Sequence, residues 1–393
     1  MIYTNASGTV AESLYGRATK AAAYALKARV LLYAASPLFN GNADYAKFAN
    51  EDGTLLFAPK DDSKWGKAAA AAKEAIDKIE GSSYYGLYYS DEPDNGYRNY
   101  MELFLPSKKW NKEYIFARNQ GTGYSDNIHQ EKCMAANGMG GWSGLCPTQE
   151  LVDAYEMANG STPIIGYNAD GTPIINGASG YSETGFAATA GKHYPAGVYN
   201  MYVGREPRFY ASINFNGQQW RGRQLEFWQG GKDGINVSKV DYCCTGYLLR
   251  KTADEGVDVI NGKGGMKEAS ILFRVGSLYL DYAEALNEAE GPVDDVYKYV
   301  DAIRKRAGLP GLAKGLDKDK MRERIQHERQ IELAFEAGHR YFDCHRWKIA
   351  EKTDNGYMHG MNITATNKVD YSKRSTVGDS RVFEKKHYLF PIP

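Results

Sequence analysis

The hydrophobic positions near the start of the chain recur with the period of an α-helix. Between residues 16 and 36, alanine and leucine repeat at spacings of three and four, so that small side chains form one narrow stripe, and Pro37 follows. Residues 63–79 show the same kind of apolar face. Because small side chains let two helices approach closely, we expect an antiparallel helical pair within residues 11–80.

The same arrangement returns in the last part of the chain, residues 271–393. Helical periodicity is found in four stretches, residues 277–290, 293–303, 317–336 and 340–350. Gly291 and Pro292 break the first two stretches apart, and Gly338 marks a kink between the last two. Paired helices with small residues at packed positions are typical of tetratricopeptide-like repeats, although no strict repeat length is present.

The middle of the chain, residues 81–270, follows a different pattern. It is rich in glycine, tyrosine, asparagine and serine, and its apolar runs are short. The three clearest predicted strands are Glu113–Arg118, Thr172–Asn176 and Phe209–Phe215. Asp170–Gly171 lies between two apolar runs and indicates a hairpin. The predicted fold class is therefore mostly α, a tetratricopeptide-like helical scaffold with a large loop-rich insertion that carries short strands.

Composition excludes two classes of protein. The 48 lysine and arginine residues balance 48 aspartate and glutamate residues, so the chain lacks the clustered positive charge of a nucleic-acid-binding protein. No run of 18 apolar residues is present, and the first ten residues have neither the basic nor the apolar region of a signal peptide. A membrane anchor, if the protein has one, would lie outside this sequence.

The chain is rich in aromatic residues that suit sugar rings. Among its 393 residues are 30 tyrosines and six tryptophans, and the insertion holds Trp110, Trp142, Trp220 and Trp228. Tyrosine and tryptophan present a flat apolar face with a polar edge, which suits the C–H faces and hydroxyls of a sugar. For each ring, burial in the core is an equally common role. Trp220 follows a predicted strand and is assigned to the core.

Enzyme motifs are not found. His327–Glu328 begins like a zinc-protease motif, but Ile331 stands where the second histidine is needed, and no nucleophile elbow is present. The five cysteines form no CxxC pair, which argues against zinc. We expect all five to be small buried thiols. The alternative is a disulfide bond after export between Cys133 and Cys146, which flank one loop. We expect no catalysis and no cofactor, and the sequence leaves room for a structural calcium ion.

Charged residues in the last helices recur at helical spacing. The positions are Glu328, Glu332, Glu336, Arg340, Asp343 and Arg346. Because buried charges are tolerated only when they are paired, we interpret this set as a structural network, in which Arg340 partners the glutamates and the last helices are tied to the sheet. It is not interpreted as a catalytic or metal site.

Several segments resemble the SusD/RagB family, outer-membrane lipoproteins that bind glycans for an uptake porin. The most specific is RIQHERQIELAFEAGHRYFDCHRW at Arg324–Trp347. Further matches, in the order of the family, are GRATKAAAYALKARVLLYAASPLFNG, LVDAYEMANG, EPRFYASINFNGQQW, TGYLLRK, FRVGSLYLDYAEALNEAEG, IRKRAGLP and HYLFPIP. The resemblance runs from about residue 16 to the end, so residues 1–393 are expected to form one SusD-like domain.

The resemblance implies a function. It predicts a surface-exposed outer-membrane protein that binds an oligosaccharide or polysaccharide and delivers it to a TonB-dependent, SusC-like porin, with no nucleic-acid partner. Family members place ligand-facing aromatics on loops ahead of the LVDAY-type motif. Tyr124 and Trp142 lie at that place in this chain. Together with other polar and aromatic residues of the insertion, the candidate glycan-binding residues are Trp142, Tyr124, Asn127, Trp228, Trp110 and Tyr89.

Two departures from the family and two alternatives remain open. Family members usually carry a lipoprotein signal, an acylated cysteine and a long helical segment before the first matched helix, and they continue past the final PIP. We therefore expect an N-terminal part and a short C-terminal tail to be missing here. A tetratricopeptide-type protein-interaction adaptor and a glycoside hydrolase are the alternative functions. The sequence does not identify the glycan.

Overall fold

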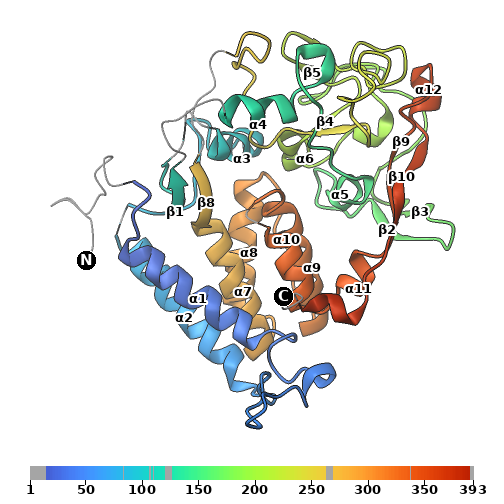
Figure 1. The fold of residues 1–393 in the computed structure, drawn as a ribbon. Coiled ribbons are helices and arrows are strands. Elements are labelled where there is room, and N and C mark those ends of the chain that lie inside the picture. Colours follow the sequence, from blue (N-terminus) through green and yellow to red (C-terminus); the bar gives the residue numbers. More distant parts are fainter. Residues whose placement is uncertain are drawn as a thin grey trace.

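The helices that were predicted as pairs form one scaffold in the computed structural model of the chain (Figure 1). The structure describes residues 15–82, 84–105, 108, 110–119, 126–262, 269–336 and 338–389. The scaffold helices are α1 (Lys20–Ala35), α2 (Ser63–Glu80), α7 (Val275–Glu290), α8 (Asp294–Arg306), α9 (Lys318–Glu332), α10 (His339–Arg346) and α11 (Ala350–Thr353). Figure 1 shows α1 and α2 side by side and antiparallel, which confirms the first predicted pair.

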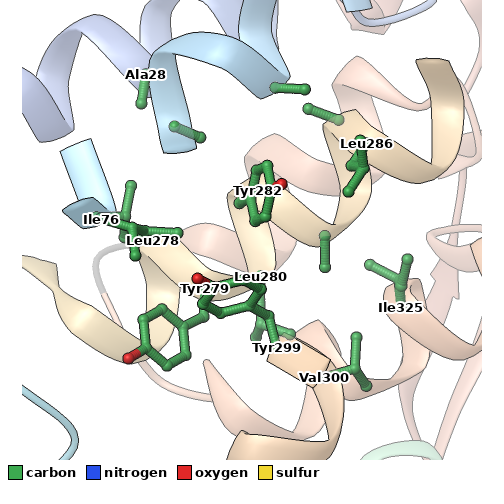
Figure 2. Packing of buried hydrophobic residues seen from close by; sticks show 14 of the residues in the cluster. Ala28, Ile76, Leu278, Tyr279, Leu280, Tyr282, Leu286, Tyr299, Val300 and Ile325 are labelled. Carbon is green, nitrogen blue, oxygen red and sulfur yellow. The ribbon is translucent and has the colours of Figure 1, made fainter. Parts of the chain in front are cut away.

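The scaffold is held by a core of small and aliphatic side chains. The alanine stripe of α1, which includes Ala25 and Ala28, is buried against Ala68 and Ala72 of α2. The same core continues into α7, α8 and α9. Figure 2 shows part of it, in which Ala28, Ile76 and Leu278 come from three different helices. Alanine at the contact lets helix axes approach closely, as the pattern predicted.

The insertion between α2 and α7 gathers on one side of the scaffold (Figure 1). Its helices are α3 (Gly96–Phe104), α4 (Asp126–Met134), α5 (Gln149–Ala154) and α6 (Pro207–Ser212). Its strands are β1 (Tyr114–Asn119), β2 (Ile164–Tyr167), β3 (Pro173–Ile175), β4 (Ile213–Phe215), β5 (Gln219–Trp220), β6 (Arg223–Gln224), β7 (Tyr247–Leu249) and β8 (Ala269–Arg274). The C-terminal part adds β9 (Gly356–Met361), α12 (Lys368–Tyr371) and β10 (Arg374–Arg381).

The strands form antiparallel pairs. The pairs are β1 with β8, β2 with β3, β4 with β7, β5 with β6 and β9 with β10. The β2–β3 hairpin turns at the predicted Asp170–Gly171, where Gly171 adopts φ +82°. The insertion has an aromatic core of its own, in which Tyr202, Phe209 and Phe215 contact one another and Trp220 is buried as predicted.

Three predicted elements have other bounds in the structure. The stretch 340–350 is not one helix, because Lys348 adopts φ +58° between α10 and α11. The stretch Phe209–Phe215 is not one strand, because Pro207 begins helix α6 and only Ile213–Phe215 is extended. Proline fixes φ at a helical value and is well suited to a first turn. Helix α9 ends at Glu332 and not at residue 336, because Phe335 and Gly338 both adopt positive φ, at +63° and +71°.

A buried network of ion pairs joins the insertion to the scaffold. Glu328 accepts hydrogen bonds from Arg208 of α6 and Arg304 of α8, and Glu332 accepts from Arg208, Arg274 and Arg306. These side chains are almost fully buried. The structural interpretation of the charged segment is therefore confirmed, including its link to the sheet, since Arg274 ends strand β8.

The prediction that Arg340 is the cation that pairs with these glutamates was wrong. Arg340 is half-buried, and in the described part of the chain it has no ion pair with the glutamates. Glu336 lies beyond the end of α9 and pairs with Arg274 and with Lys251 Nζ at 2.6 Å. Asp343 and Arg346 form a second group with Arg329 and Glu284. The chain turns between α9 and α10, so helical spacing no longer relates Arg340 to the glutamates.

The five cysteines are free thiols, as expected, and Cys146 Sγ lies 3.9 Å from Cys243 Sγ. Burial is confirmed for Cys243 and Cys344. It was wrong for the other three, because Cys133 and Cys146 are half-buried and Cys244 is exposed.

Candidate functional site

An open cavity lies where α3, a glycine-flanked loop and the end of β7 meet. We call it the Tyr97 cavity. It has a volume of about 300 Å³ and is lined by Tyr97, Gly191, Lys192, His193, Tyr194, Pro195, Gln218, Gln219 and Arg250. The lining combines aromatic rings with amide, imidazole and cationic groups, and none of these lining residues carries a carboxylate.

The start of α3 positions Tyr97. Asn95 caps the helix, because its side chain accepts a hydrogen bond from the Arg98 amide. Gly96 lies against the chain that follows α8, where a Cβ atom would come within 2.3 Å of the Ala307 carbonyl group. The first turn of α3 therefore packs directly on the scaffold backbone, and this packing fixes the position of Tyr97.

Strands β4 and β7 position the polar side of the cavity. Arg250 comes directly after β7, and its amide donates to the Ser212 carbonyl at 2.8 Å. Gln218 lies in the turn after β4, where its Oε1 accepts from the Phe215 amide at 3.2 Å. Gln218 is buried, at 2% exposure, although it lines the cavity.

Aromatic contacts hold the loop that carries His193 and Tyr194. The rings of His193 and Tyr97 stack at 4.7 Å between centroids, and His193 and Tyr194 both lie against Tyr210. The Gly191 amide donates to the Tyr194 carbonyl, which closes the loop. A second cavity, of about 330 Å³, shares Tyr97, Lys192, His193 and Tyr194 with the first, so this loop lines both.

The cavity has a positive environment. Burial, together with the charges of Lys192 and Arg250, lowers the pKa of His193 to about 4. His193 is therefore neutral near pH 7, with one nitrogen that donates and one that accepts. The lining offers hydrogen-bonding groups and ring faces, without the pair of carboxylates that a glycosidase places across a sugar. Such a lining can bind a sugar.

Among the residues proposed from sequence, Trp142 lies at the surface. Its side chain is 36% exposed, beside the His129 ring at 5.2 Å and the Lys132 ammonium at 5.4 Å. Its backbone is fixed, because the Trp142 amide donates to the Lys132 carbonyl and Gly141 packs on Ala135. The ring is thus presented on a rigid loop.

The other proposed residues are dispersed. Tyr124 and the side chain of Asn127 lie outside the described part of the chain, although the Asn127 backbone belongs to α4. Trp110 is half-buried and stacks on Tyr15 at 4.7 Å, and Trp228 is half-buried against the insertion core near Lys368. Tyr89 is 37% exposed. No ring contact joins any two of the described candidates, so which of them contact a ligand stays a prediction.

Sequence reasoning missed the Tyr97 cavity. Tyr97 was one of many tyrosines in the insertion, while Arg250 ends the TGYLLRK segment, which was used only for its resemblance to the family. The one local signal is GKHYPAG at residues 191–197, where two ring residues stand between glycine and proline. Residues up to 153 positions apart form the lining, and only the fold brings them together.

We expect Gly96→Ala to destabilise the protein. The added Cβ would overlap the backbone of Ala307, which cannot move as a flexible side chain can, so a loss of about 1–3 kcal/mol in the free energy of unfolding is expected. Gly66→Ala is the matched control, since Gly66 is exposed within α2 with no atom within 4 Å of an added Cβ, and it should gain up to about 1 kcal/mol. Urea unfolding of both variants measures this, and equal stabilities would contradict the close packing of Gly96.

Comparison with known proteins identifies the family. A profile of the SusD family matches residues 106–393, which is more than half of the chain. The chain belongs to the SusD family. It is 42% identical over 82 residues to the SusD-like protein P25 of Formosa agariphila, a match that covers 20% of this chain and 15% of that protein.

Solved structures of this family share the fold. The protein BT4246 is 27% identical, with a TM-score of 0.78 over 97% of this chain and 69% of that chain. A SusD-like protein of Bacteroides fragilis, BF3747, is 28% identical, with a TM-score of 0.68 over 97% of this chain and 63% of that one. This chain therefore spans about two thirds of these structures and a smaller share of P25. Among the described residues, no helix is long and apolar enough to cross a membrane.

Proposed function

We propose that this protein binds oligosaccharide at the cell surface and delivers it to a TonB-dependent, SusC-like outer-membrane porin, without chemical change to the glycan. The observation that supports the proposal best is the Tyr97 cavity, an open, rigid site of rings and hydrogen-bonding groups on a member of the SusD family. Stacking of a sugar on Tyr97 or Tyr194 and hydrogen bonds to its hydroxyls would use this lining. Trp142 offers a second platform outside the cavity.

A glycan array followed by calorimetry tests the binding. Open sites gain few contacts, so we expect dissociation constants from micromolar to about millimolar. Product analysis after long incubation should show intact glycan, and a rise in reducing ends with purified protein would favour a glycoside hydrolase instead. Binding of peptides in the absence of any glycan binding would favour an adaptor. Titration after chelator treatment checks that no cofactor is needed.

The porin partner and the surface location are tested in cells. The full-length protein, expressed in its native host, should be accessible to antibody on intact cells and should copurify with a SusC-like porin. Both expectations follow from membership of the SusD family. Recovery of the protein without any porin, after mild detergent extraction, would contradict the delivery role.

We expect Trp142→Ala to weaken glycan binding without unfolding the protein. Loss of a stacking platform typically costs about 1–3 kcal/mol of binding free energy. The melting temperature should barely change, because the side chain is one-third exposed and the loop is held by its backbone. Calorimetry with a glycan found on the array measures the effect. Tyr357→Ala is the control, since Tyr357 is an exposed ring on β9, and a large melting decrease with unchanged affinity would assign Trp142 to the core.

A further inference from the structure

We propose that the Tyr97 cavity binds the anionic group of an acidic sugar, a carboxylate or a sulfate ester. This inference rests on the proposed function and specifies its substrate class. Three observations carry it, namely a fixed guanidinium, a buried donor without a partner, and a lining with two cations and no carboxylate.

Arg250 is held as a fixed donor at the cavity. The carbon of its guanidinium lies 4.6 Å from the centroid of the Trp220 ring and 5.6 Å from that of the Tyr97 ring. Its Nη2 donates to Tyr97 Oη at 2.6 Å and its Nη1 donates to the Tyr210 carbonyl at 3.0 Å. Nη2 also donates to Glu255 Oε1 at 3.4 Å, whereas Nη1 has a second hydrogen for a ligand. A guanidinium held in one orientation is a group that proteins commonly use to bind oxyanions.

Gln218 supplies a donor that needs a partner. The residue is 2% exposed and lines the cavity, and its Nε2 has no hydrogen-bond partner among the described residues. Buried amide groups are almost always hydrogen-bonded, and an unpaired one is costly. Because Tyr97 Oη already accepts from Arg250, its own hydrogen is also free to donate to a ligand. Both of these groups can donate, so they favour a ligand that accepts hydrogen bonds.

The positive charge of the cavity favours a negatively charged acceptor group over a neutral one. Lys192 is exposed on the loop and Arg250 is its neighbour on the lining, while no lining residue is acidic. The acidic partner of Arg250 is Glu255, at 3.4 Å with a side chain 53% exposed, and such a contact is screened by solvent. The low pKa of His193 agrees with a positive potential at this point. A carboxylate or sulfate would form hydrogen bonds here in which donor and acceptor carry opposite charges, whereas neutral hydroxyls would lack that attraction between charges.

The test compares each acidic glycan with its neutral form. The first pair of probes is an oligosaccharide of galacturonic acid and its methyl ester. The second pair is a sulfated galactan oligosaccharide and its desulfated form. Calorimetry at low salt should show that at least one acidic probe binds about tenfold more tightly than its neutral partner, since charge-assisted hydrogen bonds are the stronger ones. The affinity should fall as salt is added. The pair in which the acidic form binds more tightly than the neutral form shows whether the ligand group is a carboxylate or a sulfate.

Variants test whether the preference for the acidic probe arises at the Tyr97 cavity. Lys192→Glu should weaken binding of the acidic probe about tenfold more than binding of the neutral probe, because the substitution reverses a charge at an exposed position of the lining and the fold is expected to be preserved. Lys47→Glu reverses an exposed charge outside the cavity and should change neither. Arg250→Gln should abolish the preference, and a melting curve shows whether that variant is folded.

Three results would overturn the inference. Equal affinity for acidic and neutral forms on both arms, with binding intact, would show a site for neutral sugars and would leave the proposed function standing. An acidic preference that Lys192→Glu does not reduce would place the anion elsewhere. A protein that binds none of the four probes and nothing on the array contradicts the proposed function together with this inference.

Discussion

Glu332→Ala should lower the free energy of unfolding by about 3–5 kcal/mol, the usual loss when one member of a buried ion pair is removed. Glu332 is fully buried and accepts hydrogen bonds from Arg274 Nη1 at 2.9 Å, from Arg208 Nη1 at 3.1 Å and from Arg306. Removing its carboxylate leaves guanidinium groups from β8, α6 and α8 without their shared partner. Urea unfolding monitored by tryptophan fluorescence measures the loss.

Arg340→Ala is the matched control for this prediction. Arg340 lies on α10, half-buried and outside the network, so its replacement should change stability by no more than about 0.5 kcal/mol. If Arg340→Ala lowers the free energy of unfolding as much as Glu332→Ala does, Arg340 is a partner of the glutamates, as helical spacing predicted. Wild-type stability of the Glu332 variant would show that the network contributes little.

Stability should also fall steeply in acid. Burial alone would raise the pKa of Glu332, but the charges of Arg306, Arg274 and Arg208 outweigh it and lower that pKa to about 2. Arg274 and Lys251 likewise outweigh burial and lower the pKa of Glu336 to about 2. Both folded values lie below the ordinary value of 4.5, so the stabilisation is complete above pH 4.5 and is lost as the pH falls towards 2.

The expected size of the acid effect is roughly 3 kcal/mol for each of these two carboxyl groups across that range. Urea titrations at several pH values between neutrality and pH 2 measure it. In Glu332→Ala the decrease should be smaller, because one of the two groups is gone. An unfolding free energy that stays level between pH 4.5 and 2 would mean that the glutamates are not held as ionised partners of the arginines.

Local patterns were sufficient for the scaffold. The alanine stripe of residues 16–36 and the periodic stretches after residue 271 predicted the helices, because one buried face at a spacing of 3.6 residues is a property of the segment itself. The Asp170–Gly171 hairpin was predicted for the same reason, since Gly171 supplies the positive φ that the turn needs. The family signature and the structural role of the charged helix were also visible in the sequence.

Contacts between distant segments decided the rest. Phe209–Phe215 has the residues of a strand, yet Pro207 and the ion pairs of Arg208 with Glu206 and Glu328 hold its first half as helix α6. Spacing along α9 predicted Arg340 as the cation, whereas the chain turns after Glu332 and the partners come from α6, α8 and β8. Helical spacing relates residues only within one helix.

For the candidate site too, some features follow from the sequence and others only from the tertiary structure. The sequence by itself determined the family, the helical scaffold and an insertion rich in rings, because these depend on residues close together along the chain. The tertiary structure decided which rings and donors share a cavity, since Tyr97, His193, Gln218 and Arg250 come from four separate segments. Arg250 becomes a fixed donor only when Trp220 and Tyr97 contact it, and these contacts follow from the complete fold.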